Sequence, residues 1–142
     1  MNVIKILIAL ILTVLSVTVS SAAVKESFTL TAGGREYTFT ADNESAAREI
    51  FAKLPESLTV KEYAGHEYFV ELPFRPDIRG EATSKLKAGH IYYWGGGNSF
   101  VLNYEDCDIA PYSSLHIGAF DDAEGICEYL RSSGRNITVS VK

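Results

Sequence analysis

The chain has 142 residues, of which 22% are charged, and its formal net charge is −5. An acidic chain without a basic stripe does not bind the phosphate backbone of nucleic acids, so no nucleic-acid partner is expected. The charge is ordinary for a soluble protein and implies no acidic function by itself.

The N-terminus has the pattern of a secretory signal peptide. Lys5 supplies a positive start, residues 6–19 are apolar apart from single Thr and Ser residues, and residues 21–23 are small, as signal peptidase requires. The apolar run is shorter than the ~20 residues that cross a bilayer comfortably. We therefore expect a signal peptide over residues 1–23, cleaved after Ala23 or the residue before it. The alternative is an uncleaved N-terminal anchor.

Residues 24–142 then form one domain of ordinary size, large enough to bury a core without obligatory disulfides or metals. Removing residues 1–23 takes away a single charge, that of Lys5, and leaves 12 basic against 18 acidic residues, a net charge of −6. The protein is expected to be exported, periplasmic or secreted, with no membrane association after cleavage.

A β-hairpin is predicted over residues 27–41. Apolar and polar residues alternate on both sides of Gly33-Gly34, as Phe28 and Leu30 show before the turn. A second hairpin is predicted over residues 57–73, with its turn near Ala64-Gly65.

A helix is predicted between the two hairpins, over residues 42–54. Asp42 or Asn43 can cap it, and Pro55 stops it. Its apolar residues recur at helical spacing: Ala47, Ile50, Phe51 and Leu54.

The second half begins with a predicted surface loop over residues 74–89, which has no periodicity. The elements expected after it are strands at 90–94, 98–104, 115–118 and 136–141, and a helix from 121 to 134. Asp121 or Asp122 can cap this helix, and Gly134 can end it in a left-handed conformation. About eight short strands with two helices predict a mainly β fold, a closed or nearly closed barrel with helices over its ends.

The glycine run Gly95–Gly97 is predicted to be a hairpin turn with positive φ at one or more residues. A phosphate-binding loop would need a following Lys-Ser/Thr at a helix start, and a dinucleotide fingerprint would need a helix after Gly97; the sequence has neither. Glycine also lets a ligand approach the backbone closely, so a turn here is compatible with the floor of a groove.

No metal, cofactor or covalent nucleophile is expected. The three histidines, His66, His90 and His116, lack the spacing of a zinc motif, and the acidic stretches lack the calcium-loop pattern. No Gly-x-Ser-x-Gly motif is present either.

Two cysteines, Cys107 and Cys127, leave two alternatives open. In an oxidising compartment the pair can close a disulfide, which would contribute ~3 kcal/mol to stability. Otherwise they are separate thiols, with Cys127 buried on a helix.

The remaining candidate binding residues are arginines and aromatics. Arg75 and Arg79 lie in the predicted loop, and the aromatic residues near the glycine run are Tyr92, Tyr93, Trp94 and Phe100. Alternation places Tyr93 on the face opposite Tyr92 and Trp94, so only a subset can line one pocket. The alternatives are core filling for the aromatics and a solvated loop for the arginines.

The order of these segments resembles the small bacterial cyclophilin-like family. The matching positions are Asn43, Ala46, Ala47, Leu54, Pro55, Leu58, Thr59, Gly89, Ile91, Tyr93, Trp94, Gly97, Asn98, Gly118 and Asp121. His90 departs from the pattern, because the family usually has Asp there. The resemblance covers nearly all of residues 24–142 and implies a cyclophilin-like barrel of about eight strands closed by two helices.

The resemblance leaves two functions to compare. The first is a binding domain that holds a peptide segment or small ligand in a groove formed by Tyr93, Trp94, Asn98 and Phe100. The second is a peptidyl-prolyl isomerase, with Arg75 or Arg79 as the hydrogen-bond donor that weakens amide resonance. The arginine-bearing motif of standard cyclophilins is absent from the corresponding segment, residues 68–81. A structural or interaction module is a third alternative.

Overall fold

The computed structural model describes residues 24–142, so the predicted signal peptide lies outside the described residues. The strands are β1 (Ser27–Ala32), β2 (Arg35–Ala41), β3 (Ser57–Tyr63), β4 (Glu67–Glu71), β5 (Ala82–Thr83), β6 (Lys85–Leu86), β7 (His90–Trp94), β8 (Ser99–Asn103), β9 (Cys107–Asp108), β10 (Ser114–Phe120) and β11 (Asn136–Val141). The helices are α1 (Glu44–Phe51), the 3₁₀ turn η1 (Gly95–Gly97) and α2 (Ala123–Arg131).

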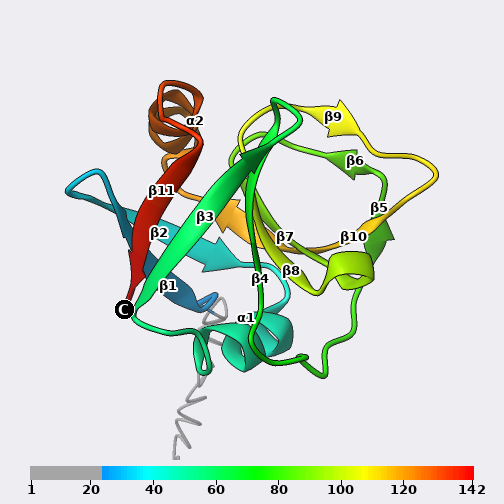
Figure 1. The fold of residues 1–142 in the computed structure, drawn as a ribbon. Coiled ribbons are helices and arrows are strands. Elements are labelled where there is room, and N and C mark those ends of the chain that lie inside the picture. Colours follow the sequence, from blue (N-terminus) through cyan, green and yellow to red (C-terminus); the bar gives the residue numbers. More distant parts are fainter. Residues whose placement is uncertain (1–23) are drawn as a thin grey trace, which may run out of the picture.

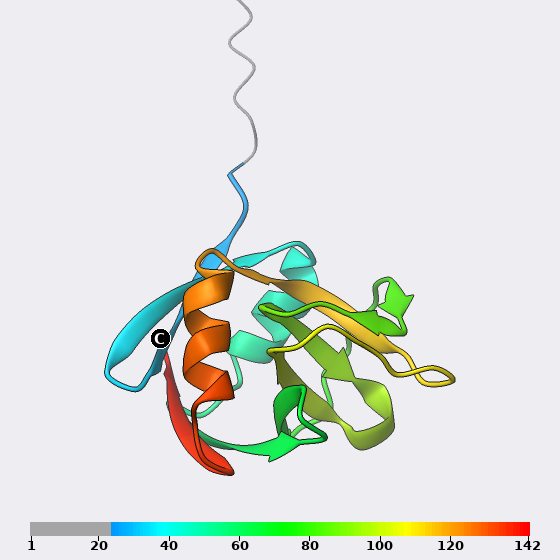
Figure 2. The ribbon, with the colours of Figure 1, turned by 90° about the horizontal axis from the view of Figure 1, so that it is seen from above.

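Eight antiparallel strands form a closed barrel. Their order around the wall is β2-β1-β11-β3-β4-β8-β7-β10, and β10 pairs back onto β2. Short β5 extends the edge of β10. Figure 1 shows α1 and α2 on opposite sides of this barrel, and seen from above α2 lies in front of α1 (Figure 2). The predicted fold, a closed eight-stranded barrel with two helices, is confirmed.

Both predicted hairpins and both predicted helices are present. Gly33 and Gly34 make the first turn with φ of 58° and 75°, a conformation that glycine adopts without steric strain. Asn43 caps α1, since its side-chain oxygen accepts the backbone N–H of Ala46 at 3.2 Å. Asp122 caps α2 in the same way. None of the helices in residues 24–142 is long and apolar enough to span a membrane.

Aromatic rings fill the barrel beside α1. The Phe51 ring packs on Phe28 with 4.5 Å between centroids, on Phe39 at 5.5 Å, and edge-on against Phe100 at 5.8 Å. Phe39 and Phe100 are fully buried. Because burial of each such side chain contributes roughly 1.5–3 kcal/mol, this cluster anchors α1 to the barrel.

The end of α2 differs from the prediction. Gly134 is not among the described residues with positive φ, so it does not end the helix in a left-handed conformation. The buried Tyr68 of β4 lies at the end of α2 instead. Its hydroxyl is within donating distance of the carbonyl oxygens of Leu130, at 3.0 Å, and Gly134, at 2.8 Å. A tyrosine of the barrel wall therefore satisfies carbonyl groups that a helix end leaves unpaired.

The segment predicted as a plain loop, residues 74–89, also contains strands. β6 pairs with β9 in a separate two-stranded ribbon. Leu86 of this ribbon packs on Tyr92 and Val101, whose side chains form a second apolar cluster apart from the main core. The prediction missed the ribbon because two-residue strands carry no detectable alternation.

Barrel closure generates the first test. A Cβ added at Gly118 of β10 would lie 2.2 Å from the backbone oxygen of Thr40 and 2.8 Å from the Phe39 ring. We expect Gly118→Ala to lower the free energy of unfolding by about 3 kcal/mol, because the backbone of Thr40 cannot shift away from the added Cβ without breaking the pairing of β2 with β10.

Gly134→Ala is the matched control, since nothing lies within 4 Å of its added Cβ. Its effect should stay within about 0.5 kcal/mol. Urea unfolding measures both variants, and equal stabilities would contradict the closure argument.

Candidate functional site

Two of the predicted groove residues lie inside the barrel. Tyr93 and Phe100 are paired across β7 and β8, and their side chains belong to the main core, 7% and 0% exposed. Core filling, the alternative to groove lining, describes their position.

Asn98 has a structural position at the end of the glycine run. Its side-chain amide donates to the carbonyl oxygens of Leu72, at 3.2 Å, and Phe74, at 2.9 Å, and its oxygen accepts the Tyr93 hydroxyl at 2.7 Å. These bonds occupy its amide and fasten the segment after β4 to the β7–β8 turn.

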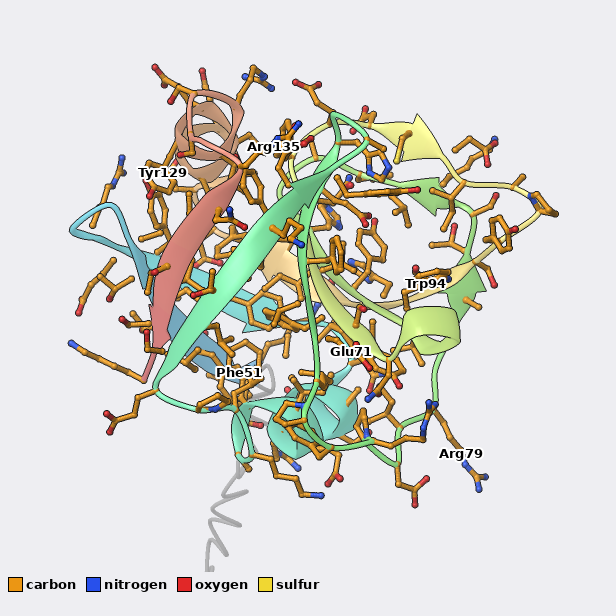
Figure 3. The ribbon with its side chains drawn as sticks, in the orientation of Figure 1. Phe51, Glu71, Arg79, Trp94, Tyr129 and Arg135 are labelled. Atoms are coloured by element: carbon orange, nitrogen blue, oxygen red, sulfur yellow. The ribbon has the colours of Figure 1, made fainter. Side chains whose placement is uncertain are left out.

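The turn itself is confirmed, but its conformation differs from the prediction. The positive φ falls on Asn98, at 47°, and not on any of the three glycines. The glycines instead make room for the indole of Trp94. A Cβ on Gly97 would lie 2.7 Å from that ring, and one on Gly96 would lie 3.1 Å from it. The glycine run therefore supports a tryptophan on the outside of the barrel (Figure 3).

Trp94 borders a groove of about 330 Å³. The Tyr112 ring stands edge-on to the indole, with 6.4 Å between centroids and 81° between planes. Ile109 and Ser114 complete this apolar end, while Tyr63, His66 and Glu67 line the other end.

Strand register shows that the groove is elongated. Glu67 lies opposite Tyr63 of β3, whereas Trp94 and Glu71 both lie opposite Ser99 of β8. Four residues of β4 separate Glu67 from Glu71, which corresponds to about 13 Å along the strand. A ligand that touches both ends must therefore be extended.

The polar end holds two titratable side chains that are mostly buried. The side chains of His66 and Glu67 are 15% and 14% exposed, and the imidazole Nδ1 lies 3.4 Å from the carboxylate. The buried Asn103 donates its amide N–H to the carbonyl of Glu105, so its oxygen faces His66 Nδ1 at 3.2 Å. Burial raises the pKa of the Glu67 carboxyl above its ordinary value, against the opposing effect of His66.

The two predicted catalytic arginines lie away from this groove. Arg75 and Arg79 are exposed, and the Arg79 guanidinium points away from the barrel in Figure 3. The Arg79 carbonyl accepts a hydrogen bond from the Asn43 amide at 2.7 Å. Arg79 thus borders a different cavity.

That second cavity is larger and polar, with a volume of about 910 Å³. It lies between the start of α1, the segment from Arg79 to Lys87, and strands β7 and β10. Its centre is a pair of imidazoles: Nδ1 of His90 is 2.8 Å from Nε2 of His116. No group of three or more His, Cys, Asp or Glu side chains in residues 24–142 is arranged to hold a metal ion.

Asp42 lies beside the histidine pair. Its carboxylate is 3.9 Å from His116 Nδ1, which favours a proton on that nitrogen. His116 Nε2 then accepts the Nδ1–H of His90, and the Nε2 of His90 carries a free lone pair. The arrangement can accept a proton from a molecule in the cavity.

Both cysteines are free thiols in the structure. Cys107 is partly exposed on β9, and Cys127 is buried on α2. Burial raises the pKa of each thiol.

Sequence reasoning missed most of the groove. Tyr63 ends the alternating strand β3 and Tyr112 follows Pro111, so neither showed a pattern beyond its local element. Glu67 and His66 lie in a predicted turn region, where charged residues are ordinary. The histidine pair was also missed, because its members are 26 residues apart.

The histidine pair generates a titration test. The His90 pKa is lowered mainly by burial, and next by the charges of His116 and Lys87. We expect His116→Gln to raise the His90 pKa towards its ordinary value, as measured by NMR titration of the ring protons. A His66→Gln control should leave the His90 titration in place, and an unchanged His90 pKa in His116→Gln would contradict the coupling.

The lowered pKa of His90 also makes the free energy of unfolding depend on pH. Because the folded-state pKa of His90 lies below its unfolded value of about 6.5, the unfolded chain binds the proton first. The contribution of His90 to stability is therefore lost as pH falls from above 6.5 towards the lowered pKa.

Comparison with known proteins agrees with this architecture. The solution structure of a hypothetical protein from Archaeoglobus fulgidus is similar, with a TM-score of 0.63 at 16% identity, over 87% of this chain and 98% of that one. A search of curated proteins found no match. The sequence model of the cyclophilin-like family matches residues 30–142. The chain therefore belongs to the cyclophilin-like family.

Proposed function

We propose that the protein is an exported binding domain that holds a short peptide segment in the groove beside Trp94. One observation carries this proposal. Of the four large hydrophobic side chains exposed in residues 24–142, three line this single groove: Tyr63, Trp94 and Tyr112. Exposed aromatic side chains gathered in one concavity are typical of binding surfaces, where their burial supplies most of the affinity.

The shape of the groove favours a peptide. The backbone positions of its two ends are offset by about 13 Å along β4, which is the span of roughly four residues of extended chain. The perpendicular rings of Trp94 and Tyr112 form a corner that suits a proline or an aromatic side chain. A compact small molecule would fill only one end.

Binding without catalysis is the activity that this geometry supports best. Weakening the resonance of a prolyl amide requires a hydrogen-bond donor beside the bound bond, since the rotation barrier is about 18–20 kcal/mol. Among residues 24–142, neither Arg75 nor Arg79 nor any other arginine lines this groove, so the arginine donor that the isomerase hypothesis names does not lie there.

Peptide binding can be followed through Trp94, because the chain contains a single tryptophan. Titration with blocked six-residue peptides containing Phe-Pro should shift the Trp94 emission and saturate. Tyr112→Ala should weaken binding roughly tenfold through the loss of one aromatic contact, whereas Tyr112→Phe should retain it.

Two outcomes would revise the function. If no peptide of such a panel changes the Trp94 emission at millimolar concentration, peptide binding is wrong. If a protease-coupled proline assay shows acceleration that both Arg75→Ala and Arg79→Ala abolish, the protein is an isomerase.

Export is supported by the N-terminal sequence and is tested separately. The protein is expressed with its own N-terminus in a bacterial host. It should appear outside the cytoplasm, with the mass of a chain that begins at Val24 or the residue before it. Recovery of the intact chain in the membrane fraction would favour the uncleaved anchor instead.

A further inference from the structure

We propose that the groove selects peptides by charge: its Glu67 end binds a Lys or Arg side chain, while its Trp94 end holds an apolar residue. The inference rests on the proposed peptide binding and names the class of peptide. The basic residue would lie two to four positions from the apolar one, since the two ends are about 13 Å apart and the basic side chain covers part of that span.

The first argument is that the Glu67 carboxylate has no cationic side chain among residues 24–142 as a close partner. Its side chain is 14% exposed, and the one basic side chain within 4 Å of its carboxylate among the described residues is that of His66, whose Nδ1 lies 3.4 Å from Oε2. A sequestered carboxylate normally has a cation or several N–H groups around it, because desolvating a charge is unfavourable. Within residues 24–142 no Lys or Arg lines this groove. A cationic ligand would supply the missing partner.

His66 does not fill that place when it is neutral. The Asn103 amide is held by Glu105, so its oxygen accepts the Nδ1–H of His66 at 3.2 Å. One hydrogen is thereby shared between an amide oxygen and a carboxylate. The negative charge of Glu67 stays largely uncompensated.

The surroundings favour a cation further. Glu62 of β3 adds a second negative charge near Glu67. The Tyr63 ring, directly opposite Glu67 in the sheet, is 58% exposed. Such an aromatic face attracts an ammonium or guanidinium group. A neutral or acidic ligand would not gain this attraction.

The proposal carries a pH dependence. The titratable groups that face Glu67 are His66 from the β3–β4 turn, Glu62 from β3 and the Cys107 thiol from β9. A cation binds the ionised carboxylate, so affinity should fall as pH falls through the raised pKa of Glu67.

The test compares matched blocked peptides at pH 8, Ala-Phe-Pro-Ala-Lys-Ala and the same peptide with acetyl-lysine or Glu in place of Lys. The wild-type protein should bind the Lys peptide about tenfold more tightly than the acetyl-lysine peptide, as a charged hydrogen bond in a sequestered site implies. The Glu peptide should bind most weakly. Trp94 emission reports all three titrations.

Glu67→Gln should bring the Lys and acetyl-lysine affinities within twofold of each other. Glu71→Gln is the matched control, because Glu71 lies four residues along β4 with its side chain exposed to solvent (Figure 3); it should retain the tenfold preference. Glu67→Gln should also unfold at an equal or higher temperature than the wild type, since it removes an unpaired charge. A purely structural Glu67 would instead give a lower unfolding temperature.

The outcomes separate the two proposals. If wild-type protein binds the Lys and acetyl-lysine peptides equally, charge selection is wrong and peptide binding stands. If neither peptide changes the Trp94 emission, both proposals are wrong. Because the first comparison uses wild-type protein, the result does not depend on how a variant folds.

Discussion

The pairing of β2 with β10 is the contact on which the rest of the molecule depends. It turns an open antiparallel sheet into a barrel, and it requires a residue without a Cβ at Gly118, where the Thr40 oxygen and the Phe39 ring leave no space. The backbone N–H groups of Asp42 and Asn43 continue this contact by donating to the carbonyl of Ile117. Closure therefore also places the start of α1 beside β10, which assembles the polar cavity.

The barrel wall separates the aromatic residues into those that point into the core and those that point outwards. Alternation along β7 sends Tyr93 into the core and Trp94 outwards, and the glycine run after β7 gives the indole a flat surface to rest on. The inward residues hold the fold together through apolar burial. The outward ones gain little from folding, and the partial burial of the Glu67 carboxylate, which raises its pKa, opposes it.

The fold was largely predictable because its signals are local. Alternating apolar residues, Gly-Gly turns and capped amphipathic helices each act over a few residues, and they identified both hairpins, both helices and the number of barrel strands. The groove was less predictable. Of its residues, Trp94 alone was a sequence candidate, since Tyr63, Glu67 and Tyr112 come from three segments that only the barrel and its outer ribbon bring together. Tyr93 and Phe100 were candidates because they are aromatic. Alternation showed that neighbouring side chains point to opposite faces of the strand, but it could not show which face is buried.

The sequence by itself determined the class of fold, the places of the turns, the candidates for each helix cap and the family pattern, because these follow from the periodicity and chemistry of neighbouring residues. Only the tertiary structure decided which face of each strand is buried and which distant side chains meet. His90 and His116 form a pair because β7 and β10 are neighbours in the closed sheet. Cys107 and Cys127 lie on different elements as free thiols for the same kind of reason. Long-range contacts depend on how the barrel closes, and closure is a property of the whole sheet.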